Sequence, residues 1–180
     1  FGSEKELLEA RKILGELKVP LYVLPGNHDS KWSESGNNDF VTIFDAEEFS
    51  FEKNGFLFIG TASGPNMRMA PGLVPREQMV FLEKTLRQMK DTLQPVIFIN
   101  HYPLDESLAN AREVVNLLKT RNTQVSLMGH GHANKKFDFE GIPGAMCRSN
   151  LRDKNEVGGY NIVTVTDDTI SFTALNSVGN

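Results

Sequence analysis

Short apolar runs alternate with amphipathic segments through the first two thirds of the chain. Three segments carry apolar side chains at helical spacing and are predicted to be helices: residues 4–17, 75–89 and 108–118. Each precedes an apolar run short enough for a buried parallel strand: residues 21–24, 96–99 and 125–128. The repeated order of helix and strand predicts an α/β arrangement around a parallel sheet.

A hairpin is predicted beside this sheet. Asn54-Gly55 separates residues 49–53 from residues 56–60, and Asn-Gly is the preferred two-residue hairpin turn, so Phe51 should face Phe58.

The last third of the chain contains short alternating segments, which predict antiparallel strands: residues 137–139, 145–148, 162–166 and 169–173. With Asp167-Asp168 as the turn, Val165 faces Ile170 and Val163 faces Phe172.

Two stretches without a clear period, residues 30–47 and 61–74, are predicted to be loops, the first with one helical turn. No repeat, linker or low-complexity tract divides the chain. We therefore expect one domain over residues 1–180, built from two packed sheets.

Composition narrows the function classes. Apolar residues make up 39% and charged residues 23% of the chain, which is typical of a soluble folded domain. The net charge of -4 provides no basic surface for nucleic acid. No apolar run approaches the roughly 18 residues of a membrane span. Because the chain has a single cysteine, Cys147, it has no internal disulfide, and the cysteine count does not decide the redox compartment. Cys147 itself is expected to be a small core residue.

All four histidines directly follow predicted strands. His28 lies between Asn27 and Asp29, His101 follows Asn100, and His130 and His132 flank Gly131. A single histidine at a strand end is more often structural than a ligand. Because parallel strands end at one edge of a sheet, however, four such positions favour a shared metal site. Gly131 would allow the tight backbone that directs both neighbouring rings to one centre.

Other catalytic motifs are missing. Residues 60–64, Gly-Thr-Ala-Ser-Gly, do not have the spacing of a nucleophile elbow, which disfavours a serine hydrolase. The chain also lacks a phosphate-binding P-loop.

Three motifs carry a resemblance to a known family. Gly26-Asn27-His28-Asp29, Asn100-His101 and Gly129-His130-Gly131-His132 resemble the third, fourth and fifth motifs of the calcineurin-like metallophosphoesterases. The resemblance implies a four-layer αββα sandwich, in which helices flank two mixed β-sheets, and a dinuclear metal centre.

The resemblance also implies roles. Asn27, His101 and His130 would bind one ion and His132 the other. His28 would protonate the leaving oxygen or stabilise the transition state, with Asp29 holding its ring. Such a centre hydrolyses a phosphodiester or phosphomonoester through a metal-bridging hydroxide, so the expected partner is a small phosphate ester or nucleotide-like substrate. The expected cofactors are two divalent or trivalent ions, namely Mn, Fe, Zn or Ni.

The family's first two motifs, Asp-x-His and a bridging Gly-Asp, do not occur in the sequence. We therefore expect the chain to be the C-terminal portion of a metallophosphoesterase domain that lacks its N-terminal strands. The missing N-terminal segment would be a partner, and the chain alone should bind metal weakly. Two alternatives stay open: a mononuclear hydrolase that uses Asn27, His101 and His130, and a non-catalytic relic that acts as a binding module.

Two arginines are candidates for contact with a substrate phosphate, because guanidinium groups bind phosphate in a fork. Arg68 lies in the second predicted loop and Arg148 follows a predicted strand.

Overall fold

The computed structural model describes residues 2–30, 33–64, 71–150, 158–166 and 169–176. The helices are α1 (Glu4–Leu14), α2 (Asn27–Ser30), α3 (Asn38–Phe44), α4 (Arg76–Gln88) and α5 (Ala111–Leu118). The strands are β1 (Glu48–Lys53), β2 (Phe56–Thr61), β3 (Pro95–Ile99), β4 (Asn122–Met128), β5 (Lys135–Phe139), β6 (Ile142–Met146), β7 (Gly159–Val165) and β8 (Ile170–Asn176).

Six of these strands form a mixed sheet in the order β1-β2-β3-β4-β6-β5. The inner strands β2, β3, β4 and β6 are parallel, and the outer strands β1 and β5 pair antiparallel with their neighbours. The parallel strands therefore end at one edge of the sheet, which is where the predicted ligand motifs follow β3 and β4.

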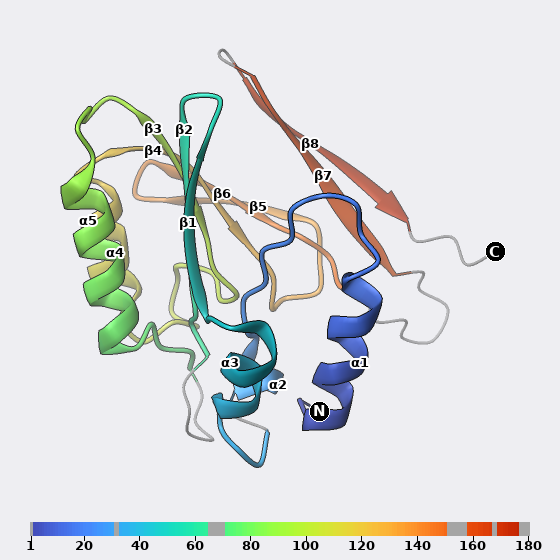
Figure 1. Cartoon of the computed structure of the whole chain (residues 1–180). Coiled ribbons are helices and arrows are strands. Elements are labelled where there is room, and N and C mark those ends of the chain that lie inside the picture. The colour runs from blue at the N-terminus through green and yellow to red at the C-terminus, as the bar shows by residue number, and fades with distance from the viewer. Residues whose placement is uncertain (1, 31–32, 65–70, 151–157, 167–168, 177–180) are drawn as a thin grey trace.

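Helices cover one face of this sheet and a two-stranded sheet lies against the other (Figure 1). The larger core cluster joins α4 and α5 to the sheet, with Leu82, Phe98 and Val114 all 0% exposed. On the opposite face, Ile97 and Val125 pack against Val165, Ile170 and Phe172 of β7 and β8. Successive side chains of β3 point to opposite faces of the sheet, so Phe98 enters the larger core and Ile97 the core on the opposite face.

The predicted α/β class, with a mixed sheet and flanking helices, is confirmed. The second sheet was expected to be mixed, but in the described part of the chain it is a single antiparallel pair, β7 and β8. Its predicted register is confirmed, because Val163 pairs with Phe172 and Val165 with Ile170. The predicted Asp167-Asp168 turn lies outside the described residues.

The β1–β2 hairpin also follows the prediction. Phe51 pairs with Phe58, and their rings stack at 4.7 Å between centroids. Asn54 and Gly55 both have positive φ, 50° and 79°, as a two-residue turn with the twist of the flanking strands requires.

The prediction of a buried parallel strand at residues 21–24 is wrong, because these residues form no strand. No strand in the described ranges pairs with them to complete a ladder. Tyr22 is 46% exposed, and its ring stacks on Phe51 at 4.2 Å. An apolar run becomes a strand only where a neighbouring edge accepts its backbone hydrogen bonds, so side-chain stacking holds this segment instead.

Smaller differences concern the ends of elements. Helix α1 begins with a capping box between Ser3 and Glu6 and ends at Leu14, with Gly15 as the C-cap, rather than at residue 17. The first predicted loop contains the seven-residue helix α3 rather than one turn.

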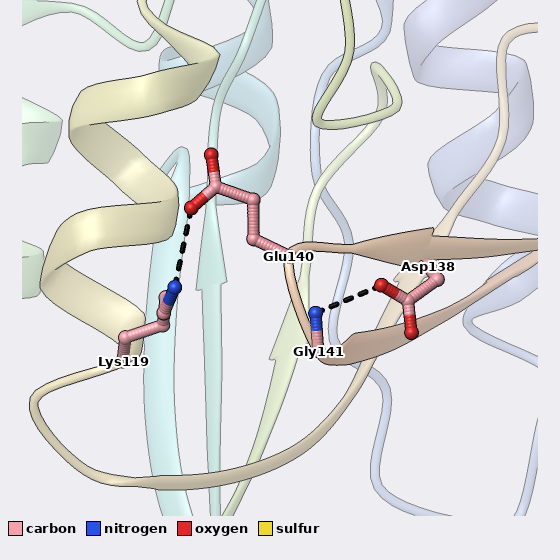
Figure 2. Close-up of polar contacts among 4 residues, drawn as sticks. All are labelled: Lys119, Asp138, Glu140 and Gly141. Carbon is pink, nitrogen blue, oxygen red and sulfur yellow. Dashed lines mark hydrogen bonds and ion pairs between the residues drawn. The ribbon is translucent and has the colours of Figure 1, made fainter.

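Strand β6 spans Ile142–Met146 rather than residues 145–148, because a two-residue turn at Glu140 and Gly141, both with positive φ, starts it earlier. Figure 2 shows this turn: Asp138 accepts a hydrogen bond from the Gly141 N–H at 2.8 Å, and Lys119 pairs with Glu140 at 3.2 Å.

Candidate metal centre

The carboxyl edge of the parallel sheet brings three of the four predicted metal ligands together. Asn27 begins α2, and His101 lies two residues beyond the end of β3. The Oδ1 atom of Asn27 lies 2.8 Å from Nε2 of His101, although 74 positions separate them in the sequence. The ring of His130, beyond β4, lies edge-on to that of His101 with 5.2 Å between centroids.

The spacing of the first two donor atoms fits a shared cation. Two ligands at about 2.1 Å from one ion and at right angles to each other are about 3 Å apart. The two atoms are joined by a hydrogen bond of 2.8 Å, a separation close to this value. An amide oxygen and an imidazole nitrogen also suit a borderline metal. Gly26 permits the approach, because a Cβ atom there would lie 3.0 Å from Cε1 of His101.

His130 and His132 have left-handed backbones, with φ of 67° and 53°. Residues other than glycine rarely adopt this conformation, which often marks a functional turn. The predicted role of Gly131 is corrected, since the positive φ falls on its two neighbours. Gly131 instead allows close packing, because a Cβ atom there would lie 2.6 Å from Sδ of Met146.

His132 and His28 are both exposed at this edge. Among the residues that the structure describes, no group of three or more His, Cys, Asp or Glu side chains could hold an ion. The predicted ligands that converge in the described residues are Asn27, His101 and His130, the set that was predicted for one ion. The assignment of His132 to a second ion stays a prediction.

Asp29 accepts a hydrogen bond from the Gly26 backbone N–H at 2.8 Å and so closes the turn that presents Asn27. Burial raises the pKa of the Asp29 carboxyl above its usual range, while the Gly26 N–H and the charge of His28 oppose this shift. That Asp29 holds the His28 ring stays a prediction.

The sequence reasoning missed several supporting residues. Asn100 is 3% exposed, and its Nδ2 donates to the Tyr102 carbonyl at 2.7 Å, which closes the loop after β3. The Tyr102 ring packs on His130 at 4.0 Å between centroids. Ser63 accepts hydrogen bonds from the backbone N–H groups of His101 and Tyr102. Only Asn100 carried a signal, as the neighbour of His101 in its motif.

The two candidate arginines are not brought to the centre by any described contact. Arg68 lies outside the described residues. Arg148 follows β6 at the correct edge, and its backbone N–H donates to Oδ1 of Asn134 at 3.3 Å. Its side chain packs on Gly159, where a Cβ atom would lie 2.9 Å from Cδ of Arg148. Its contact with substrate stays a prediction.

A largely apolar cavity of about 590 Å³ begins beside His101 and Gly129. Residues 20–24, strand β1 and the β7–β8 pair provide its walls, and the ends of β3, β4 and β6 line it too. Cys147 lies in this lining, half-buried rather than in the core, and burial raises the pKa of its thiol.

Comparison with known proteins identifies the class. The sequence model of the calcineurin-like phosphoesterases matches residues 3–134, so the chain belongs to this family of phosphate-ester hydrolases. A protein of Vesicomyosocius okutanii subsp. Calyptogena okutanii, named "Probable cyclic nucleotide phosphodiesterase", is 26% identical over 93% of the chain and 73% of its own length. A protein of Arcobacter nitrofigilis, named "Probable glycerophosphodiester phosphodiesterase GpdQ", is 30% identical over 71% of the chain and 47% of its own length.

Two solved structures share the fold. A dimetal phosphatase from Danio rerio matches 77% of the chain and 60% of its own length, with a TM-score of 0.60 and 13% identity. A candidate 5′-nucleotidase from Staphylococcus aureus in complex with α-ketoglutarate matches 99% of the chain and 41% of its own length, with a TM-score of 0.54 and 12% identity. No helix in the described ranges is long and apolar enough to cross a membrane.

Proposed function

We propose that this chain forms part of a metal-dependent phosphoesterase that hydrolyses a phosphodiester, and that Asn27, His101 and His130 hold one of its cations. The single observation that carries this proposal is the 2.8 Å separation of the Asn27 and His101 donor atoms at the carboxyl edge of the sheet. Membership of the phosphoesterase family and relatives named as phosphodiesterases support it.

Bound Mn, Fe, Zn or Ni ions would supply Lewis acidity to the phosphate and lower the pKa of an attacking water. The chain's own residues bind and orient. Asn27 offers an amide oxygen and His101 its Nε2, while Tyr102 packs against His130 and restricts its ring. His132, exposed on the same loop, would contribute to a second ion.

His28 is proposed to transfer a proton rather than to bind metal. Its side chain is exposed to solvent while the neighbouring Asn27 is 8% exposed, so the two side chains meet different surroundings. An imidazole titrates near neutral pH and can protonate the leaving alkoxide of a phosphate ester. We assign His28 this role, with Asp29 holding its ring.

The substrate class is tested with an aryl phosphodiester and the matching aryl phosphomonoester, each with Mn²⁺ or with a chelator. The proposal predicts hydrolysis of the diester that the chelator abolishes and that His101→Ala lowers by at least about 100-fold. Equal rates with chelator and with Mn²⁺ would contradict metal dependence. Faster hydrolysis of the monoester would contradict the choice of diester.

The second cation needs carboxylate ligands that the described residues do not gather. We propose that a segment carrying the family's Asp-x-His and Gly-Asp motifs provides them by occupying the cavity between residues 20–24 and the β7–β8 pair. The chain spans 73% and 47% of the lengths of the two curated relatives. Added to the chain, this segment should raise the metal content from one ion to two.

A second candidate function is a binding module with an incomplete centre. The exposure of His132 and the lack of a carboxylate cluster in the described ranges favour it. Metal stoichiometry, measured with the segment that carries the Asp-x-His and Gly-Asp motifs added, distinguishes the possibilities: two ions indicate a dinuclear enzyme, one ion a mononuclear hydrolase, and none a binding module.

A further inference from the structure

Residues 62–64, directly beyond β2, contact both loops that carry the proposed metal ligands. Ala62 is 1% and Ser63 is 0% exposed. The Ala62 N–H donates to Oε1 of Gln78 in α4 at 3.2 Å, which ties the segment to the helix layer. The Ser63 carbonyl accepts a hydrogen bond from the Leu73 N–H at 2.9 Å. The segment is therefore held on both sides before it reaches the ligand loops.

The Ser63 hydroxyl holds the loop after β3. Its Oγ accepts hydrogen bonds from the backbone N–H groups of His101 and Tyr102, each at 3.1 Å. Both groups lie just beyond the strand ladder, and Tyr102 is 2% exposed. A hydroxyl oxygen has two lone pairs and can accept both bonds. These two bonds fix the peptides on either side of the His101 Cα atom, and hence the direction in which the His101 side chain leaves the backbone.

Gly64 lies against the other ligand loop. A Cβ atom at this position would be 2.1 Å from Oγ of Ser30, 3.1 Å from the Gly26 carbonyl oxygen and 3.4 Å from Cα of Asn27. Neighbouring residues of one segment thus touch the turn that presents Asn27 and the loop that presents His101. The Asn27 and His101 donor atoms meet between these two contacts at 2.8 Å.

We propose that Ser63 is a positioning residue of the metal centre, which aims the Nε2 atom of His101 at the cation shared with Asn27 by fixing the His101 and Tyr102 amides. This inference rests on the proposed function, because it treats His101 as a ligand. Ser63 is not a nucleophile here. Its oxygen already accepts two hydrogen bonds, and the side chain is fully buried.

The test compares Mn²⁺ affinity, measured by calorimetry, in four forms of the chain: wild type, Ser63→Ala, Ser63→Thr and Ser126→Ala. Ser126, in β4, is an apt control because it is 0% exposed and its Oγ has no hydrogen-bond partner within the described residues. We expect Ser63→Ala to weaken binding about 10-fold, as loss of an outer-shell partner typically does. Ser63→Thr, which keeps the hydroxyl, and Ser126→Ala should stay within about threefold of wild type.

Three results would overturn the proposal: wild-type affinity in Ser63→Ala, an equal loss in Ser126→Ala, or no rescue by Ser63→Thr. If Ser63→Ala does not fold, Ser63→Cys replaces it, since a thiol is a weaker acceptor.

A metal-free measurement separates this inference from the proposed function. In NMR spectra of the apo chain, Ser63→Ala should shift or double the His101 ring signals, and Ser126→Ala should leave them unchanged. A wild-type chain that binds no Mn²⁺ would reject the proposed function, and the NMR comparison then decides the role of Ser63. Unchanged His101 signals in Ser63→Ala would reject that role.

Discussion

Gly64→Ala tests whether the segment beyond β2 is packed directly against the turn that presents Asn27. The new methyl group would lie 2.1 Å from Oγ of Ser30, well inside the contact distance, and 3.1 Å from the Gly26 carbonyl oxygen. Ser30 is 0% exposed and donates a hydrogen bond to that carbonyl at 3.0 Å, so its side chain has no space to withdraw. Overpacking of this kind typically costs about 1–3 kcal/mol.

The origin of the cost can be isolated with a double-mutant cycle. Ser30→Ala removes the clashing oxygen and one buried hydrogen bond, a loss of about 1 kcal/mol on its own. In the double variant, the methyl group introduced by Gly64→Ala enters space that Oγ of Ser30 has vacated. The combined loss should therefore be smaller than the sum of the two single losses by at least about 1 kcal/mol.

Urea unfolding of the metal-free chain, followed by circular dichroism, measures each free energy of unfolding. Gly64→Ala combined with Ser126→Ala is the matched control, because Ser126 lies in β4 and its losses should simply add. Additivity of Gly64→Ala and Ser30→Ala to within about 0.5 kcal/mol would refute the contact.

Two further predictions concern charges away from the metal centre. Burial, and then the charge of Glu48, raise the pKa of Glu47 in the folded chain. Just above the ordinary glutamate pKa, the folded chain therefore holds a proton that the unfolded chain has released. Stability should therefore fall as pH rises through this window, and Glu47→Gln should flatten that fall in urea midpoints measured from about pH 4 to pH 7; an unchanged slope would contradict it. Lys119→Met should change the free energy of unfolding by less than about 1 kcal/mol, because the paired side chains of Lys119 and Glu140 are 45% and 59% exposed, respectively. A loss above about 2 kcal/mol would show that the pair contributes more than a surface ion pair can.

Local patterns were sufficient where neighbouring residues alone decide the structure. The Asn54-Gly55 turn and the alternation on either side of it predicted the pairing of Phe51 with Phe58. The same reasoning predicted the register of β7 and β8. Residues 21–24 have an equally apolar pattern, yet a strand also needs an edge to pair with, and the pattern of one segment cannot show whether that edge exists.

The candidate site likewise contains residues that the sequence could reveal and residues that it could not. Its histidines and Asn27 could be found because each belongs to a short motif at a strand end. Ser63 could not, because its hydrogen bond to His101 spans 38 positions and nothing near it in the sequence indicates the contact. The left-handed backbones of His130 and His132 also escaped prediction, because glycine is the residue expected there and Gly131 lies between them.

The central claim is that Asn27 and His101 bind one cation together, and Mn²⁺ titration of the purified chain tests it most directly. The account predicts at least one bound ion per chain, with affinity lowered by at least about tenfold in Asn27→Ala and in His101→Ala. Ser126→Ala should bind as the wild type does. A wild-type chain that binds no Mn²⁺, or a His101→Ala chain that binds it with undiminished affinity, would contradict the account.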